Sequence, residues 1–332
     1  MPDQTHDNAM KVPLTIVVPS CARSHLLERT LQSLSECDLP SNLKEVVVVE
    51  NGPRGHAEAL VARFRDVLPI RHRHIERANK SYALNQILAG YENEFVIFFD
   101  DDVRLHPQIL TAYAKAVGDR TGGTFWGGRC LVDQEKAPPD WLVPYLPDSA
   151  RGWSPSDTAF ELSAPNALGF NWGVFARDFN EVGGFDERRG PGTGVTGDEP
   201  DLQKRLFERG VRGYYLPEAV VWHYVPEERC TPEWALDRIR VTAISKGIYL
   251  TEGGWRLCCY KAAALRVRMA ILSLVLSCGK FRLGTLQLFR YKFQRQWIRG
   301  ALEGMKLAAV QKSRKVCVDT QESVISQNTS CV

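Results

Sequence analysis

The sequence predicts an α/β fold with a mixed, mostly parallel sheet flanked by helices, followed by a C-terminal helical extension. Runs of β-branched and aromatic residues alternate four times with segments of helical apolar spacing between Leu14 and Val117. Such alternation is typical of parallel strands joined by right-handed crossover helices. From Thr231 onward the sequence is helical in pattern.

The elements of the alternating part are bounded by turn and helix signals. Leu27, Leu31 and Leu34 recur at helical spacing. Asn51-Gly52-Pro53 ends the second strand, and Pro107 is well placed in the first turn of a helix. The expected strands cover residues 14–19, 45–50, 71–75 and 95–99, and the expected helices cover 24–35, 56–65, 81–90 and 107–117.

Beyond Gly118 the alternation is less regular. Residues 137–163 are rich in proline and tryptophan and have no helical or strand period, which indicates a long surface loop. A glycine-rich segment, 190–197, leads into a helix that should end near Arg209, because Gly210 follows. Further strands are expected at residues 126–131, 168–175 and 213–223.

The composition of the 332 residues, 44% hydrophobic and 24% charged, is ordinary for a soluble globular protein. The net charge of +3 is too small to argue for a nucleic-acid partner. Nine cysteines, an odd number without a C-x-x-C pair, favour free thiols in a reducing compartment. Met1–Lys11 is polar and lacks the apolar core of a signal peptide, so a cytoplasmic location is expected.

Three adjacent carboxylates, Asp100, Asp101 and Asp102, follow the apolar run Phe95–Phe99. In an open parallel sheet, ligands bind at this end of the strands, and a divalent cation relieves repulsion among the acids. Strand alternation predicts that Asp100 and Asp102 point to one side and Asp101 to the other. A solvated turn that caps the next helix is the alternative.

The first strand is followed by Pro19-Ser20-Cys21-Ala22-Arg23-Ser24 rather than by G-x-G-x-x-G. A dinucleotide fold of the dehydrogenase type would therefore lack its phosphate cradle. If a nucleotide diphosphate binds, a metal held by Asp100 and Asp102 is the candidate for neutralising it.

The C-terminal region is basic, with Glu303 as its only acid between Lys280 and Lys315. Ala262–Leu276 is apolar, but arginines interrupt it and it is too short to span a bilayer. Aromatic residues interleaved with the basic ones fit a helix that lies on an anionic membrane surface. The alternative is a basic-faced helical hairpin packed on the domain, so peripheral contact at the inner membrane face stays open.

Taken together, these motifs resemble those of the family 2 glycosyltransferases, inverting enzymes with the GT-A fold, over roughly Leu14–His223. Each motif alone is weak, whereas their order and spacing are specific. The components are Val18-Pro19, the acid-ended second strand before Asn51-Gly52, Asn79–Asn85, Asp100–Asp102 as the D-x-D motif, Asn171 in the G-x-N segment, Gly183–Glu187, Gly197–Leu202 in place of G-E-D-x-D-L, and Val221–His223.

The resemblance implies a nucleotide-sugar donor, with a UDP-sugar expected, and bound Mn2+ or Mg2+. Glu50 takes the place of the acid that contacts the nucleotide base, and Asp100 would lie near the ribose. Asp102 would bind the metal, and His223 would complete the metal site. A structural hydrogen bond is the alternative for His223. The other residues expected on the donor side are Pro19, Asn79, Asn85 and Asp101.

On the acceptor side, the resemblance implies that Asn171 and Trp172 border the acceptor and that an acid at a helix start is the general base. The second acid of the family pattern aligns with Glu199, with Asp198 as the alternate. The order here is Asp-Glu, so the longer side chain stands at the base position. Both acids could instead serve only the helix N-terminus.

The expectation is thus a metal-dependent, inverting glycosyltransferase that acts on a glycan or lipid-linked acceptor in polysaccharide biosynthesis. The alternatives are an inactive sugar-nucleotide-binding scaffold and, ranked last, a nucleotidyltransferase. The expected organisation is a disordered N-terminus (1–11), a GT-A domain (12–230), a basic amphipathic helical extension (231–315) and a disordered tail (316–332).

Overall fold

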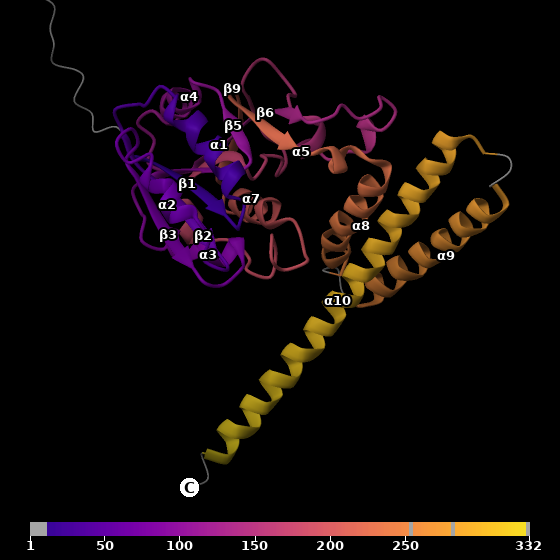
Figure 1. Ribbon diagram of the computed structural model, residues 1–332. Helices are drawn as coiled ribbons and strands as arrows, with labels where there is room; N and C mark the ends of the chain where they lie inside the picture. Colours follow the sequence, from indigo (N-terminus) through magenta and orange to yellow (C-terminus); the bar gives the residue numbers. More distant parts are fainter. Residues whose placement is uncertain (1–11, 252–254, 280–282, 330–332) are drawn as a thin grey trace, which may run out of the picture. The chain divides into compact units, whose positions relative to one another are not determined.

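The computed structural model describes residues 12–251, 255–279 and 283–329, with side chains up to residue 310 apart from residues 255 and 279 (Figure 1). The predicted disordered N-terminus, 1–11, lies outside the described residues. The chain divides after Cys230 into two compact units. The first is an α/β unit and the second is helical.

The α/β unit is built on one mixed sheet in the order β3-β2-β1-β4-β8-β6-β9-β5, with β7 paired to β9. β1, β2, β3 and β4 are mutually parallel, as predicted from the alternation. β8 runs antiparallel between β4 and β6. The strands are β1 (Leu14–Ser20), β2 (Leu43–Asn51), β3 (Ile70–Ile75), β4 (Phe95–Phe99), β5 (Val103–Leu105), β6 (Thr124–Gln134), β7 (Phe160–Glu161), β8 (Asn171–Phe175) and β9 (Arg212–Val225).

Helices cover both faces of the sheet because successive side chains of a strand point to opposite faces. In β1, Ile16 and Val18 belong to the core beneath α1, α2 and α4, whereas Val17 belongs to the core beneath α3, α6 and α7. The helices of this unit are α1 (Ser24–Ser35), α2 (Ala57–Ala62), α3 (Lys80–Leu88), α4 (Ile109–Val117), α5 (Asp148–Arg151), α6 (Ala176–Glu181) and α7 (Asp198–Glu208).

The segment predicted as one long loop, 137–163, contains short elements. These are a 3-10 turn at Val143–Tyr145, helix α5 and strand β7. β7 has two residues and pairs with Tyr214 and Tyr215 of β9. Elements this short have no period to be read from the sequence.

The helical unit begins with a capped helix. The Thr231 hydroxyl accepts from the Trp234 backbone N–H at the start of α8, and Pro232 occupies its first turn. The helices of this unit are α8 (Pro232–Tyr249), α9 (Trp255–Gly279) and α10 (Thr285–Thr329). α10 continues through the stretch predicted as a disordered tail, 316–329. No glycine or proline interrupts that stretch, and the backbone of a helix satisfies its own hydrogen bonds.

Glycines bring α8 and α10 into close contact. A Cβ atom on Gly300 would lie 2.0 Å from the Arg240 carbonyl oxygen, and one on Gly304 would lie 1.9 Å from that of Ile244. On α8, a Cβ on Gly247 would lie 2.1 Å from the Ala301 carbonyl. The two helices therefore touch through their backbones.

Candidate active site

The acid triplet lies in the turn between β4 and β5 rather than on a strand. Asp101 and Asp102 both pair with the Arg23 guanidinium, in the loop between β1 and α1. The predicted alternation, with Asp101 turned away from Asp102, is therefore wrong. Its physical reason is that β4 ends at Phe99, so the strand period no longer applies.

Asp101 is the most deeply buried acid of the triplet. Its Oδ2 accepts a hydrogen bond of 2.6 Å from the Ser20 hydroxyl at the end of β1. Burial raises the pKa of the Asp101 carboxyl to about 7, even though Arg23 and the Ser20 hydrogen bond act in the opposite direction. Asp101 thus anchors the turn, which leaves its two neighbours to face other groups.

Strand register places His223 beside Asp102. β5 pairs with β9 so that Val103 lies opposite His223, and His223 Nε2 is 3.5 Å from Asp102 Oδ1. The imidazole stacks on Phe170, with ring centroids 4.6 Å apart. Burial lowers the pKa of His223, although Asp102 and Asp100 raise it, so the neutral imidazole is favoured.

Asp102 and His223 together suit two positions of a metal coordination sphere. Asp102 Oδ1 is buried without a hydrogen-bond partner, and a neutral imidazole nitrogen is a common metal ligand. Among the residues that the structure describes, no group of three or more histidine, cysteine, aspartate or glutamate side chains could hold an ion. A cation held by Asp102 and His223 would therefore need ligands other than a third such side chain from the described residues.

The second pair of acids stands at the start of α7. The helix follows Gly197, whose φ of +92° is a left-handed conformation that suits glycine. Asp198 and Glu199 are its first two residues. Glu199 packs on Gly169, where an added Cβ would lie only 2.0 Å from Glu199 Oε1. The missing side chain at residue 169 therefore makes room for the carboxylate.

Lys80 joins the two groups of acids. Its ammonium Nζ lies 2.7 Å from Asp100 Oδ1 and 3.3 Å from Glu199 Oε1. The Lys80 side chain is 9% exposed, whereas those of Asp100 and Glu199 are 23% and 17% exposed. In this cluster, Asp100 and Glu199 are thus the acids that still reach solvent around a buried cation.

The acids of α7 differ in protonation. Burial and the neighbouring Glu199 raise the pKa of Asp198 well above its ordinary range, although Lys80 opposes the shift. Burial alone would raise the pKa of Glu199, but Lys80 and a hydrogen bond from Asp198 lower it. The structure therefore favours the protonated form of Asp198 and the ionised form of Glu199.

The structure thus brings together six of the residues expected from the sequence, which are Asp100, Asp101, Asp102, Asp198, Glu199 and His223. Arg23 and Lys80 were not among the expected site residues. Lys80 follows Asn79, a helix N-cap, but nothing in the sequence tells that a lysine at this position is buried. Its place beside two acids depends on contacts across 20 and 119 residues.

Asn171 and Trp172 are placed in the core, which differs from their expected position at the acceptor. Both are 0% exposed. The Asn171 amide donates to the carbonyls of Arg129 and Ala219, and its oxygen accepts from Tyr113. In this structure neither side chain is open to an acceptor, because β8 is covered on both faces.

Asn79 and Asn85 fasten α3 to a loop rather than point to a donor site. The Asn79 amide donates to the Glu187 carbonyl and its oxygen caps α3. The Asn85 amide donates to the Phe185 carbonyl and its oxygen accepts from the Phe185 N–H. These contacts supply a structural reason for the two asparagines.

Pro19 and Glu50 lie side by side at the ends of two strands. Pro19 pairs with Val49 in β2, and the neighbouring Ser20 pairs with Glu50. Glu50 is 2% exposed, with one carboxylate oxygen held by the Gly55 N–H and the other 3.0 Å from His72 Nε2. Pro19 thus takes part in the sheet through its backbone pairing with β2, and the Glu50 carboxylate is hydrogen-bonded to the loop that follows β2.

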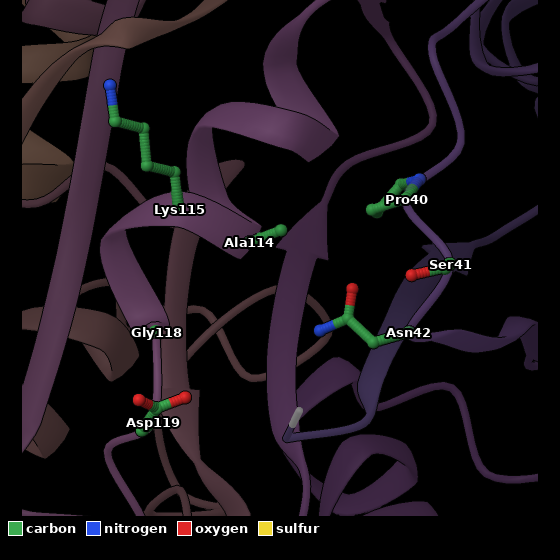
Figure 2. A pocket seen from close by; sticks show the side chains of 7 residues that line it. All are labelled: Pro40, Ser41, Asn42, Ala114, Lys115, Gly118 and Asp119. Atoms are coloured by element: carbon green, nitrogen blue, oxygen red, sulfur yellow. The ribbon is translucent and has the colours of Figure 1, made fainter. Parts of the chain in front are cut away.

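A separate pocket of about 410 Å³ lies at the opposite end of the strands (Figure 2). Asn42 precedes β2, and its amide donates to the Val12 carbonyl just before β1. The pocket is lined by Pro40, Ser41, Asn42, Ala114, Lys115, Gly118 and Asp119. It therefore takes no part in the acid cluster, which lies where β1 and β4 end.

Residues 15–157 match a family model described as glycosyl transferase family 2. No curated protein matches the chain. The mannosyltransferase PcManGT from Pyrobaculum calidifontis, solved with GDP-Man and Mn2+, is 19% identical with a TM-score of 0.56, over 92% of this chain and 90% of that one.

Two further solved structures have similar scores. Fragment 1–349 of S. aureus TarS with UDP-GlcNAc is 16% identical, with a TM-score of 0.50, over 89% of this chain and 92% of the fragment. GalNAc-T7 with UDP, GalNAc and Mn2+ is 14% identical, with a TM-score of 0.52, over 87% of this chain and 56% of GalNAc-T7. The chain spans 44% of a longer TarS structure. These likenesses confirm the predicted α/β fold with a sheet flanked by helices.

Proposed function

We propose that the chain is a glycosyltransferase that moves a sugar from a nucleotide-sugar donor to an acceptor hydroxyl with inversion. Its match to the family 2 model over residues 15–157 supports this proposal. One observation carries this proposal: Asp100 and Glu199 both contact the Lys80 ammonium group. Asp102, two residues after Asp100, lies beside His223. A donor-side acid group and an ionised carboxylate thus lie within one connected cluster.

Glu199 is the proposed general base. Direct displacement at the anomeric carbon needs a group that takes the proton of the attacking hydroxyl, and an ionised carboxylate with exposed surface can do so. Asp198 is favoured as the protonated acid, so it is not ready to accept a proton. Its hydrogen bond to Glu199 would orient the base.

Asp102 and His223 are the proposed metal-holding residues, and Mn2+ or Mg2+ is the proposed ion. When bound, a divalent cation stabilises the charge that develops on a departing diphosphate. The unpartnered Asp102 Oδ1 and the neutral His223 ring support this assignment. The relatives solved with GDP-Man, UDP-GlcNAc or Mn2+ support a nucleotide-sugar donor and a divalent ion.

The donor base is proposed to lie near Glu50, at the end of β2, and His72 of β3, whose Nε2 lies 3.0 Å from the Glu50 carboxylate. A UDP-sugar is the proposed donor and a glycan or lipid-linked hydroxyl the proposed acceptor. Screening UDP- and GDP-sugars for Mn2+-dependent hydrolysis would identify the donor. Turnover should require the ion and stop when a chelator removes it.

The test of the catalytic assignment compares Glu199→Gln and Asp102→Asn with the wild type, using the donor found in that screen. Loss of the base should lower kcat by about 10²- to 10⁴-fold with little change in donor affinity. Asp102→Asn should weaken Mn2+-dependent nucleotide binding. Substantial transfer by both variants would refute the proposed centre.

The helical unit is the proposed site of contact with an anionic membrane face. Tyr260, Val267, Ile271 and Leu274 of α9 are 57–74% exposed and follow one another at intervals of seven, four and three residues, so they form one apolar stripe. Residues 253–302 contain ten basic residues and no acidic one. Among the described residues, no helix has the length and apolar content to cross a bilayer.

Charge decides between a lipid surface and a second copy of α9. Lys261 and Arg268 flank the stripe, and a paired copy would offer no acid to meet them. Anionic headgroups would attract both. The protein should float with phosphatidylglycerol vesicles but not with phosphatidylcholine vesicles, and Val267→Glu with Ile271→Glu should abolish this. Val67→Glu, at an exposed valine of the α/β unit, is the control and should leave vesicle binding unchanged. If the double variant Val267→Glu with Ile271→Glu still binds vesicles, the α9 stripe is not the membrane-contact surface.

A further inference from the structure

Lys80 is a buried cation within the acid cluster. It is the first residue of α3, directly after the N-cap Asn79, and its side chain is almost fully buried. Burial of an ammonium group is costly unless acids compensate for the lost hydration. Burial lowers the pKa of Lys80, but Asp100, Glu199 and Asp198 together raise it, so Lys80 stays charged.

We propose that Lys80 is a positioning residue that couples the donor site to the general base by holding Asp100 and Glu199 on one ammonium group. The proposal rests on the assignment of Glu199 as the base. An ammonium group has three N–H donors, and the contacts at 2.7 and 3.3 Å direct two of them to the two acids. The carboxylate of the base is thereby fixed relative to Asp100.

The backbone around Lys80 is held on the same loop that leads to the base. The Lys80 N–H donates to the Pro191 carbonyl, and the Ser81 hydroxyl donates to that of Arg189. Gly192 approaches Ala78 so closely that a Cβ would lie 2.1 Å from the Ala78 carbonyl oxygen. The start of α3 and the loop before α7 therefore form one frame, which keeps the lysine aligned with Glu199.

The charged groups that face Glu199 explain what Lys80 does for its ionisation. From α3 comes Lys80, from α7 comes the adjacent Asp198, and from the β4–β5 turn comes Asp100. Burial raises the pKa of Glu199, whereas Lys80, the cation among them, and the hydrogen bond from Asp198 lower it. Removing its charge should therefore raise the pKa of Glu199.

The test is the pH profile of donor turnover by Lys80→Met, which keeps most of the length of the side chain but removes the charge. We expect kcat at pH 7 to fall at least tenfold and the acidic limb of the profile to move to higher pH, so that activity partly returns at pH 9. KM should change less than kcat. Lys80→Arg keeps a cation and should keep the acidic limb in place.

Lys44→Met is the matched control, because Lys44 also pairs with a glutamate, Glu94, but at the start of β2. Its pH profile should match that of the wild type. If Lys80→Met loses activity equally at every pH, or keeps the wild-type limb, the coupling proposal is wrong.

A double variant keeps the test decisive if Lys80→Met alone unfolds. Lys80→Met with Glu199→Gln removes both charges of the pair, and it should be no less active than Glu199→Gln alone if the two residues act as a unit. A further tenfold loss would contradict the proposal. An active Glu199→Gln would instead refute the base assignment itself, which separates the two failures.

Discussion

Two cations neutralise the acid cluster, and they differ in how firmly they are held. Arg23 pairs with Asp101 and Asp102 from a loop, and its side chain is 39% exposed. Lys80 pairs with Asp100 and Glu199 from the first turn of a helix and is 9% exposed. We therefore expect Arg23 to turn into solvent if another cation takes its place, whereas the enclosed Lys80 should stay with its acids. The difference indicates an exchangeable charge beside the proposed metal ligands and a permanent one beside the proposed base.

The largest difference is expected in stability. Lys80→Met leaves buried acids without their cation and should lower the free energy of unfolding by about 3–5 kcal/mol. Arg23→Met removes an ion pair from a partly exposed side chain and should lower it by about 1 kcal/mol. Urea denaturation of both variants without added metal would measure the two losses. Equal losses would show that the two cations are held alike.

A smaller effect is expected on metal binding. Arg23 Nη1 lies 2.7 Å from Asp102 Oδ2, so the guanidinium and a bound ion would compete for this carboxylate. Arg23→Met should tighten Mn2+ binding to the donor-free protein by roughly tenfold, about 1.4 kcal/mol. Titration calorimetry with Mn2+ measures this directly, and Lys44→Met should leave the affinity unchanged. Weaker binding in the arginine variant would show that Arg23 supports the metal site instead of competing for it.

The smallest effect is expected for Asp198→Asn, because asparagine resembles the protonated acid that the structure favours. kcat near pH 7 should stay within about threefold, given that the base retains its ionised form. A loss as large as that of Glu199→Gln, measured with the same donor, would transfer the base role to Asp198.

The same variant tests a pH dependence of stability. The pKa of Asp198 is raised in the folded state, so its contribution to stability is present at low pH and is lost as the pH rises above the ordinary aspartate range. The melting temperature of Asp198→Asn should therefore fall less than that of the wild type as the pH is raised. Parallel curves for the two proteins would contradict the raised pKa.

Local patterns predicted the strands and helices well because they depend on neighbouring residues. The helix expected at 24–35 is α1, and Gly210, with a φ of +84°, follows the end of α7 as its sequence predicted. Motif order predicted Asp102 and Glu199 as site residues, and both lie in the acid cluster. The place of β8 between β4 and β6 was not predicted, because no local sequence pattern indicates which strands an antiparallel strand pairs with.

Contacts between residues that are distant in the sequence could not be predicted either, because local patterns depend only on neighbouring residues. Asn171 stands in a motif that resembles a functional one, yet its amide is satisfied by Arg129 and Ala219, both more than 40 residues away. The burial of Lys80 follows from packing of a loop that begins more than 100 residues later. Motif identity located the neighbourhood of the site, and only packing decided which side chains face it.

The backbone contact between α8 and α10 has a consequence for conformational entropy. Gly247, Gly300 and Gly304 have no rotamers to lose on packing, and the neighbouring Ala301 has none either. These two helices can therefore be ordered with little loss of side-chain freedom. The long side chains of the helical unit, such as Arg266 and Arg268 of α9, remain exposed and can keep most of their rotamers.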